Sequence, residues 1–391
     1  MRKFAWLLCL SGFALTACQS VDETTSVLDT KKKSSLPLAM DDPMAKLGGQ
    51  LYFDVNLSLN RNQSCATCHN PAKGFIDDRD NGVFGMASLG SDNVSIGDRN
   101  APTAAYAALS PLFSKNKEGK YIGGQFHDGR ASTLADQAAG PPLNPGEMAM
   151  LSEDQVLTRI NENATYQKLF SHLFGAEVLT DSKQAYKAMS DSIMAFEQTE
   201  LFMPFDSKYD KYLRGEVAFT DQEELGRTLF FSEQFTNCNQ CHQLSSSPFY
   251  ATESFTDFSY HNIGVPENKA LRAINGVTAT DFGLFNNPEA SFESEKGKFK
   301  VPSLRNVAVT GPYMHNGVFQ DLKTVVLFYD KYNNVTRTEN PETGELWGQP
   351  EVGINLATEL TDGPALPDER VDALVAFLKT LTDARYESQL N

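Results

Sequence analysis

Two short motifs carry the residues best suited to chemistry. The first motif, "SCATCHN", contains Cys65, Cys68 and His69. The second, "NCNQCHQ", contains Cys238, Cys241 and His242. In a CxxCH motif two thiols can form thioether bonds with a haem, and the histidine that follows can ligate its iron. The sequence therefore predicts two covalently bound haem c groups.

The same cysteines allow two other interpretations. Four thiolates could bind one zinc ion, or each pair could be a redox dithiol. The chain has six cysteines, of which Cys9 and Cys18 lie in the N-terminal segment, so the CxxC pairs use all the others. The histidine after both pairs and the absence of a spare cysteine favour haem.

The segments before the two motifs are similar to each other and indicate an internal duplication. "LGGQLYFDVNLSLNRNQSCATCH" and "LGRTLFFSEQFTNCNQCH" share the pattern LGxxL(F/Y)F. The repeated positions are Leu47, Gly48, Leu51, Tyr52 and Phe53, which recur as Leu225, Gly226, Leu229, Phe230 and Phe231. We expect a helix before each haem-binding loop, with Thr220 and Glu223 forming a capping box at the second.

Other helices follow from apolar periodicity, and no segment shows the alternation typical of a strand. Ser152 and Gln155 are expected to cap "EDQVLTRI". Two apolar stripes predict further helices: Ala185, Met189, Ile193 and Phe196, and Val371, Leu374, Val375 and Leu378. The predicted fold is mainly α, with two cytochrome c-like haem domains at 41–210 and 211–391.

The N-terminus reads as an export signal. In "MRKFAWLLCLSGFALTAC", Arg2 and Lys3 precede a short apolar run and small residues. The segment resembles a bacterial lipoprotein signal over 1–18, which would leave Cys18 lipidated, followed by a polar tether at 19–40. An ordinary signal peptide cut nearby is the alternative. We expect a periplasmic protein anchored by lipid to the outer membrane.

Size and charge narrow the possible partners. A chain of 391 residues suggests two domains, and no apolar run after the first twenty positions is long enough to cross a bilayer. The net charge is −16, and removing the signal leaves 32 positive and 50 negative residues, or −18. Such a surface disfavours nucleic acid and could attract a basic redox partner.

Several longer motifs resemble the bacterial dihaem cytochrome c peroxidase and MauG family. They include "RNAPT", "DGRA", "QAAGP", "GEM", "HNIGVP" and "VPSLRNVAVTGPYMHNG". The resemblance implies that the N-terminal haem reacts with hydrogen peroxide, with Glu147 as acid and base and Gln137 lining the same pocket. A carboxylate can move a proton from the inner to the outer peroxide oxygen. The alternative for Glu147 is an exposed acid in a Pro-Gly loop.

The resemblance also bears on the first iron and on a metal ion. Many family members carry a histidine before "NAPT" that closes the peroxide site, but "DRDNGVFGMASLGSDNVSIGDRN" has none. We therefore expect an open or water-ligated iron without reductive activation. Asn100, Thr310 and Pro312 match positions that hold one calcium ion, for which oxygen ligands are suitable. Otherwise Asn100 simply caps a turn before Pro102.

Two histidines match positions near the haems of the family. His127 stands in "FHDGR", where the family usually has tryptophan as a relay between the haems. Because imidazole is harder to oxidise than indole, His127 could instead be a hydrogen-bonding bridge or a haem propionate partner. His261 in "YHNIGVP" lies near the haems, with its role left open.

The sixth ligand of the second haem separates the branches of the family. Peroxidases have methionine fourteen residues after the histidine of "PYxHxG", and counting from His315 gives Tyr329, at the end of a helix expected over "FQDLKTVVLFYD", 319–330. A phenolate ligand is typical of the MauG-like branch. Tyr329 could instead pack on the core, and Met314 is a rival ligand.

Three functions are compatible with these features. The first is a dihaem peroxidase that reduces hydrogen peroxide with electrons relayed through the C-terminal haem from a small periplasmic cytochrome c or cupredoxin. The second is a MauG-like enzyme that uses peroxide to oxidise a side chain of a partner protein. The third, a non-catalytic dihaem carrier or sensor, is disfavoured by Glu147 and Gln137.

Overall fold

The chain folds mainly into helices joined by long loops. The structure, a computed structural model, describes residues 37–244 and 252–390, so the predicted signal, Cys18 and most of the tether lie outside the described residues. The helices of the first half are α1 (Pro43–Tyr52), α2 (Cys65–Cys68), α3 (Leu134–Ala138), α4 (Gly140–Leu143), α5 (Glu153–Asn161), α6 (Ala164–Phe174) and α7 (Ser182–Glu197). Those of the second half are α8 (Lys208–Leu213), α9 (Asp221–Phe230), α10 (Lys269–Asn275), α11 (Leu322–Asp330) and α12 (Asp368–Lys379).

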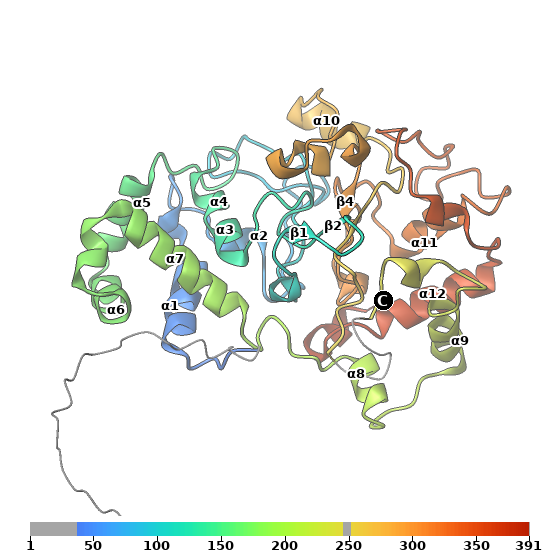
Figure 1. The fold of residues 1–391 in the computed structure, drawn as a ribbon, viewed down its shortest axis with the longest axis horizontal. Helices are drawn as coiled ribbons and strands as arrows, with labels where there is room; N and C mark the ends of the chain where they lie inside the picture. The colour runs from blue at the N-terminus through green and yellow to red at the C-terminus, as the bar shows by residue number, and fades with distance from the viewer. Residues whose placement is uncertain (1–36, 245–251, 391) are drawn as a thin grey trace, which may run out of the picture. The chain divides into compact units, whose positions relative to one another are not determined.

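The duplicated LGxxL segments form two equivalent helix crossings. Helix α1 packs on α7, and α9 packs on α12 (Figure 1). A Cβ atom at Gly48 would collide with the carbonyl oxygen of Ser192, and one at Gly226 would collide with that of Ala373. Glycine is therefore needed at both crossings because each helix lies directly against the backbone of its partner.

Side chains cap the predicted helices as expected. The Ser152 hydroxyl accepts a hydrogen bond of 3.3 Å from the Gln155 amide at the start of α5. At α9 the Thr220 hydroxyl accepts one of 3.3 Å from the Glu223 amide, while the Glu223 carboxylate accepts one of 2.7 Å from the Thr220 amide. The predicted capping box is confirmed.

Helix α11 begins later than the sequence pattern indicated. Asp321 precedes it, and its carboxylate accepts hydrogen bonds from the amides of Lys323, at 2.6 Å, and Thr324, at 3.4 Å. Because an aspartate that caps these amides lies outside the helix, α11 starts at Leu322 rather than at Phe319. Tyr329 then falls in its last turn.

Two hydrophobic cores follow each other along the chain. The first contains buried residues from Leu47 to Met203, and the second from Tyr209 to Leu381. In the predicted stripes every residue is buried except Val375, which packs against the second core while partly exposed. Figure 1 shows the two helix groups on opposite sides of the view. The change of core falls close to the predicted connection near residue 210.

The strands of the described chain form two short antiparallel pairs. Strand β1 (Ser114–Lys115) pairs with β2 (Tyr121–Ile122), and β3 (Tyr260–His261) pairs with β4 (Phe299–Lys300). We predicted no strands, because two residues are too few to show alternation. Lys300 also donates its amide to the His127 carbonyl at 2.9 Å, so both halves meet here. None of the helices in the described part of the chain is long and apolar enough to span a membrane.

Candidate functional site

The first CxxCH motif presents a neutral histidine beside two thiols. Cys65 and Cys68 bound the single turn α2, and His69 follows directly. The Nδ1 atom of His69 lies 3.2 Å from the carbonyl oxygen of Phe75. Because a carbonyl only accepts, Nδ1 carries the proton and Nε2 keeps a lone pair for a metal. Burial also lowers the pKa of His69, which keeps the ring neutral.

The second motif repeats this arrangement. The Nδ1 atom of His242 lies 3.0 Å from the carbonyl oxygen of Phe255, and burial lowers the pKa of His242. Phe75 and Phe255 are both buried, and both have left-handed backbones, with φ of 58° and 55°. Such a conformation is uncommon for a bulky residue. Its recurrence shows that the duplication includes the histidine partner.

A second pair of equivalent hydrogen bonds holds the backbone just before Phe75 and Phe255. The Thr103 hydroxyl donates to the Gly74 carbonyl at 2.6 Å, and the Ser303 hydroxyl donates to the Ser254 carbonyl at 2.8 Å. Gly74 and Ser254 directly precede Phe75 and Phe255, whose carbonyl oxygens lie beside Nδ1 of the two histidines. Sequence analysis missed this repeat, although "APTAAY" and "VPSLRN" share a proline followed by a hydroxyl residue.

The two cysteine pairs lie in different parts of the structure. Cys65 packs against the first core and Cys238 against the second. Within residues 37–244 and 252–390 no group of three or more His, Cys, Asp or Glu side chains could hold a metal ion. A single four-thiolate zinc site is therefore wrong. Two thiols with a neutral histidine at each place fit a covalently bound haem.

Glu147 lies within electrostatic reach of the first motif. It occupies the turn after α4, where its carbonyl oxygen accepts a hydrogen bond of 2.7 Å from the Ser91 amide. Burial raises the pKa of Glu147, against the opposing charge of Arg130. Burial also raises the pKa values of Cys65 and Cys68, and the charge of Glu147 adds to both. The predicted acid is thus close to the first haem-binding motif.

Gln137 lies on α3, which leads through α4 into the turn of Glu147. The Thr133 hydroxyl caps α3 by accepting a hydrogen bond of 3.0 Å from the Asp136 amide. Gln137 is partly exposed, and its side chain makes no hydrogen bond with any residue of the described ranges. A shared pocket with Glu147 stays a prediction.

Tyr329 lies near the second motif. Burial raises the pKa of Tyr329, and the charges of Cys241 and Cys238 raise it further. Its hydroxyl makes no hydrogen bond to another described residue. Met314 lies in an earlier turn with a left-handed φ of 70°, where its carbonyl oxygen accepts a hydrogen bond of 3.2 Å from Gly317. Which of the two binds iron stays a prediction, but the phenol is close to the motif.

His127 is held in a chain of hydrogen bonds. Its Nε2 atom lies 3.0 Å from the carbonyl oxygen of Asn100, so Nε2 carries the proton. The Asn100 amide in turn donates to the His315 carbonyl at 2.7 Å. Burial, reinforced by the positive charge of Arg99, lowers the pKa of His127 to about 4. A neutral bridging imidazole agrees with the predicted hydrogen-bonding role.

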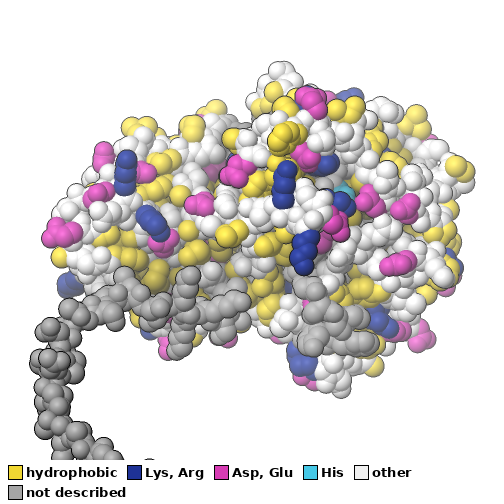
Figure 2. All heavy atoms as spheres, viewed as in Figure 1, with side chains coloured by type: hydrophobic (Ala, Val, Ile, Leu, Met, Phe, Trp, Pro, Cys, Tyr) yellow, Lys and Arg dark blue, Asp and Glu magenta, His cyan; other side chains and the backbone are white. Residues whose placement is uncertain are grey.

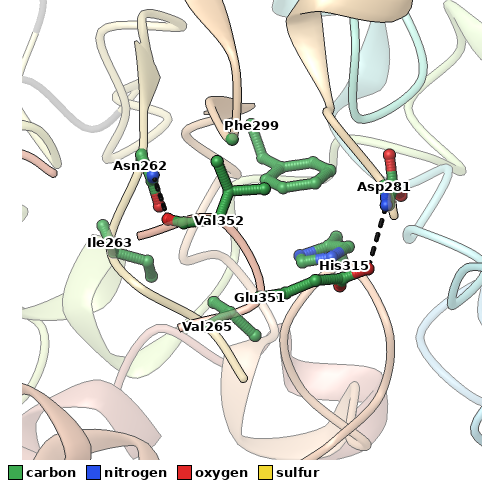
Figure 3. Close-up of a pocket in the computed structure, with 9 residues that line it drawn as sticks. Asn262, Ile263, Val265, Asp281, Phe299, His315, Glu351 and Val352 are labelled. Atoms are coloured by element: carbon green, nitrogen blue, oxygen red, sulfur yellow. Dashed lines mark hydrogen bonds between the residues drawn. The ribbon is translucent and has the colours of Figure 1, made fainter. Parts of the chain in front are cut away.

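His315, from which Tyr329 was counted in the sequence, is a buried histidine in the structure. It is 6% exposed and stacks on Phe299, with ring centroids 3.6 Å apart. Its Nε2 atom is buried without a hydrogen-bond partner in the described ranges, and burial lowers its pKa to about 3. Figure 3 shows the ring in a pocket with Asp281 and Glu351 beside it.

His261 is connected to the second motif through two side chains. Its Nε2 atom lies 2.9 Å from the Ser259 hydroxyl, which donates to the Asp257 carboxylate at 2.6 Å. The Asp257 amide donates to the Cys241 carbonyl at 3.0 Å. The haem vicinity of His261 stays a prediction.

The three predicted calcium residues come from two segments, one with Asn100 and the other with Thr310 and Pro312. The Asn100 side-chain amide is 3.3 Å from the Met86 carbonyl and 3.5 Å from that of Gly85. A Cβ atom at Gly85 would lie 3.7 Å from Cδ of Pro312, so Asn100 and Pro312 share a neighbour. Thr310 packs instead beside Gly74. The arrangement offers oxygen atoms, and calcium stays a prediction.

The fold and the two CxxCH motifs define a dihaem c-type protein. Residues 42–218 match the family model of the di-haem cytochrome c peroxidases. The methylamine utilization protein MauG of Paracoccus denitrificans is 52% identical over 357 residues, which are 90% of this chain and 91% of that protein. The cytochrome c551 peroxidase of Nitrosomonas europaea is 30% identical over 350 residues, 87% of this chain and 80% of that protein.

A solved structure agrees with these similarities. The diheme peroxidase BthA of Burkholderia thailandensis superposes with a TM-score of 0.81 at 32% identity, covering 90% of this chain and 88% of that one. The chain belongs to the dihaem cytochrome c peroxidase and MauG family. It is a peroxidase-like oxidoreductase, and its family implies two haem c groups and peroxide as the oxidant. The predicted family and the mainly α fold are confirmed.

Proposed function

We propose that the chain is a MauG-like oxidase that uses hydrogen peroxide at its first haem to oxidise a side chain of a partner protein. The observation that carries this choice is the phenol of Tyr329, which lies in the last turn of α11, fourteen residues after His315, with no hydrogen-bond partner among the described residues. As an anionic oxygen ligand, a phenolate stabilises ferric and higher states of the second haem. The sequence alone had placed peroxide scavenging first. The 52% identity to the methylamine utilization protein MauG supports the MauG-like alternative.

The residues around the first motif support the reaction with peroxide. When bound, the haem supplies an iron that receives peroxide and stores its oxidising equivalents. Glu147 takes the proton from the inner peroxide oxygen and returns it to the outer one, so that water can leave. Its raised pKa suits both directions of transfer. Gln137 orients the peroxide through its amide.

The loop before "NAPT" leaves the first site open. Residues 78–100 contain no histidine, so the loop has no imidazole to close the position that faces Glu147. The enzyme then reacts with peroxide in its fully ferric form, without prior reduction of the second haem.

His127 favours a second candidate, a peroxidase that receives electrons from a small cytochrome c or cupredoxin. Its imidazole replaces the indole through which oxidising equivalents would pass between the haems, and imidazole is harder to oxidise. Its hydrogen bond of 3.0 Å to Asn100 makes it a neutral bridge instead. Figure 2 shows acidic side chains among apolar and basic ones on the face in view.

Steady-state consumption of peroxide separates the two candidates. We expect little turnover with reduced small cytochrome c or cupredoxin as the donor, both in the unaltered protein and in Met314→Leu. Rapid turnover that requires the reduced donor would support the peroxidase. His127→Trp should speed the passage of oxidising equivalents between the haems of a MauG-like enzyme.

Three further assignments belong to the same proposal. One calcium ion binds Asn100 with the carbonyls of Thr310 and Pro312, which metal analysis before and after chelation would test. The chain divides near residue 210 into two haem domains. It is exported to the periplasm and anchored at Cys18, and labelling with a radioactive fatty acid, abolished by Cys18→Ser, would test the anchor.

A further inference from the structure

Glu197 is a buried carboxylic acid that the proposed function does not use. It ends helix α7, is 5% exposed, and its Oε2 atom is buried without a hydrogen-bond partner among the described residues. Burial alone raises its pKa to about 8. Burying this carboxyl costs free energy because Oε2 loses its hydrogen bonds to water and gains no hydrogen bond in exchange.

The end of α7 lies against the helix that precedes the first haem-binding motif, since the rings of Phe196, next to Glu197, and of Tyr52 have centroids 5.3 Å apart. Burial raises the pKa values of Tyr52, on α1, and Cys65, on α2, and the charge of Glu197 is the next largest cause for both. Tyr52 also donates its hydroxyl to the carbonyl of His69 at 2.9 Å. Tyr52 and Cys65 are thus the titratable groups of α1 and α2 whose pKa values the charge of Glu197 raises.

The internal duplication supplies a comparison within the same chain. "AFEQT" on α7 corresponds to "AFLKT" on α12, so Glu197 corresponds to Leu378. The glycine crossings support this match, because a Cβ atom at Gly48 would lie 2.9 Å from Cβ of Phe196 and one at Gly226 would lie 2.8 Å from Cβ of Phe377.

The second half therefore builds the same crossing without polar groups. Leu378 is 7% exposed where the first half has Glu197, and Phe230 is 2% exposed where the first half has Tyr52. Because apolar side chains complete this packing in one copy, packing does not explain the acid in the other. The polar pair is confined to the copy with the proposed peroxide-reactive haem.

We propose that Glu197 is a proton-binding site coupled to the redox state of the first haem. The carboxylate takes up one proton when the iron gains one electron, and releases it when the electron leaves. The net charge of the buried site then stays constant, which costs less free energy in a low-dielectric interior than a change of net charge. The electron comes from a small redox protein or an electrode mediator. The proposal needs haem on Cys65 and Cys68 but does not depend on the peroxide reaction.

The test is the midpoint potential of each haem, measured by spectroelectrochemistry between about pH 5 and 9 on protein that contains two haems per chain. We expect the potential of the first haem to fall as pH rises, by at most about 59 mV for a tenfold change in proton concentration. Glu197→Gln and Glu197→Leu should abolish this dependence, and the latter installs the side chain that the other half already accommodates. Glu200→Gln, at an exposed acid on the same segment, is the matched control.

The second haem is an internal control, because its crossing contains Leu378 and should be unaffected by any of these variants. Redox difference infrared spectra should also show a carboxylic acid band that is lost in Glu197→Gln. An unchanged pH dependence in both Glu197 variants, or a potential of the first haem that does not vary with pH, would overturn the proposal. Failure of the peroxide reaction would leave these potentials measurable, so the two proposals can fail separately.

Discussion

The carbonyl oxygen of Phe75 accepts a hydrogen bond from Nδ1 of His69 over 3.2 Å, and Phe255 repeats the contact with His242 over 3.0 Å. The two histidines are therefore held alike, and each offers Nε2 to a metal. Different chemistry at the two haems must come from other groups. Glu147 stands near the first motif and Tyr329 near the second, and these two side chains carry the proposed division of roles.

Replacing Glu147 by glutamine should slow the reaction of the diferric protein with peroxide by roughly 10²–10⁴-fold, since the amide cannot accept the peroxide proton. Stopped-flow absorbance measures this rate, with Asp154→Asn on the exposed surface of α5 as the control. In the unaltered protein burial raises the pKa of Glu147. The rate should therefore fall as pH drops through that raised pKa, because the carboxylate is lost. Parental kinetics in Glu147→Gln would show that the residue is misassigned.

Tyr329→Met should convert the second haem to a methionine-ligated form with a higher potential, because a thioether favours ferrous iron. Near-infrared and EPR spectra of the ferric protein report the change through the methionine charge-transfer band. Met314→Leu is the matched control and should leave the spectra as they are. A methionine band in the unaltered protein that disappears in Met314→Leu would identify Met314 as the ligand.

Glu197 should make stability depend on pH. Its pKa is raised by burial from an ordinary 4.5 to about 8, so the unfolded chain releases this proton at lower pH than the folded one. The contribution of this protonated carboxyl to the free energy of unfolding is fully present below about pH 4.5. It is lost as pH rises toward 8, by at most about 1.4 kcal/mol per pH unit. The melting temperature of Glu197→Gln should therefore rise relative to that of the unaltered protein as pH increases. A constant difference between the two from pH 5 to 8 would contradict the buried acid.

The glycine crossings should respond alike to a single methyl group. Gly48→Ala and Gly226→Ala force the added Cβ against the backbone of Ser192 and Ala373, which should cost about 1–3 kcal/mol or more of unfolding free energy. Gly353→Ala is the control, since an added Cβ there meets nothing within 4 Å. Thermal unfolding measures all three. Equal stability of the Gly48 and Gly353 variants would show that α1 and α7 do not pack as described.

Local patterns in the sequence predicted the helices well, because caps and apolar stripes depend on neighbours along the chain. The cap at Ser152, the capping box at Thr220 and the two LGxxL helices are examples. The sequence-based start of α11 was wrong because Asp321 binds two amides from outside the helix.

The contacts that complete the sites were harder to predict. The left-handed backbones at Phe75 and Phe255 occur at residues that rarely adopt them, so no glycine marks them in the sequence. The buried state of Glu197 depends on how α7 packs against other elements. Its match with Leu378 could still have been read from "AFEQT" and "AFLKT".

The most direct test of the proposed function is to add one equivalent of hydrogen peroxide to the diferric protein and follow its absorption and EPR spectra. We expect a reaction without prior reduction, followed by a long-lived state that holds two oxidising equivalents until a partner protein or an added reductant consumes them. Absence of any reaction until the second haem has been reduced, followed by rapid turnover with a small redox protein, would contradict the MauG-like function.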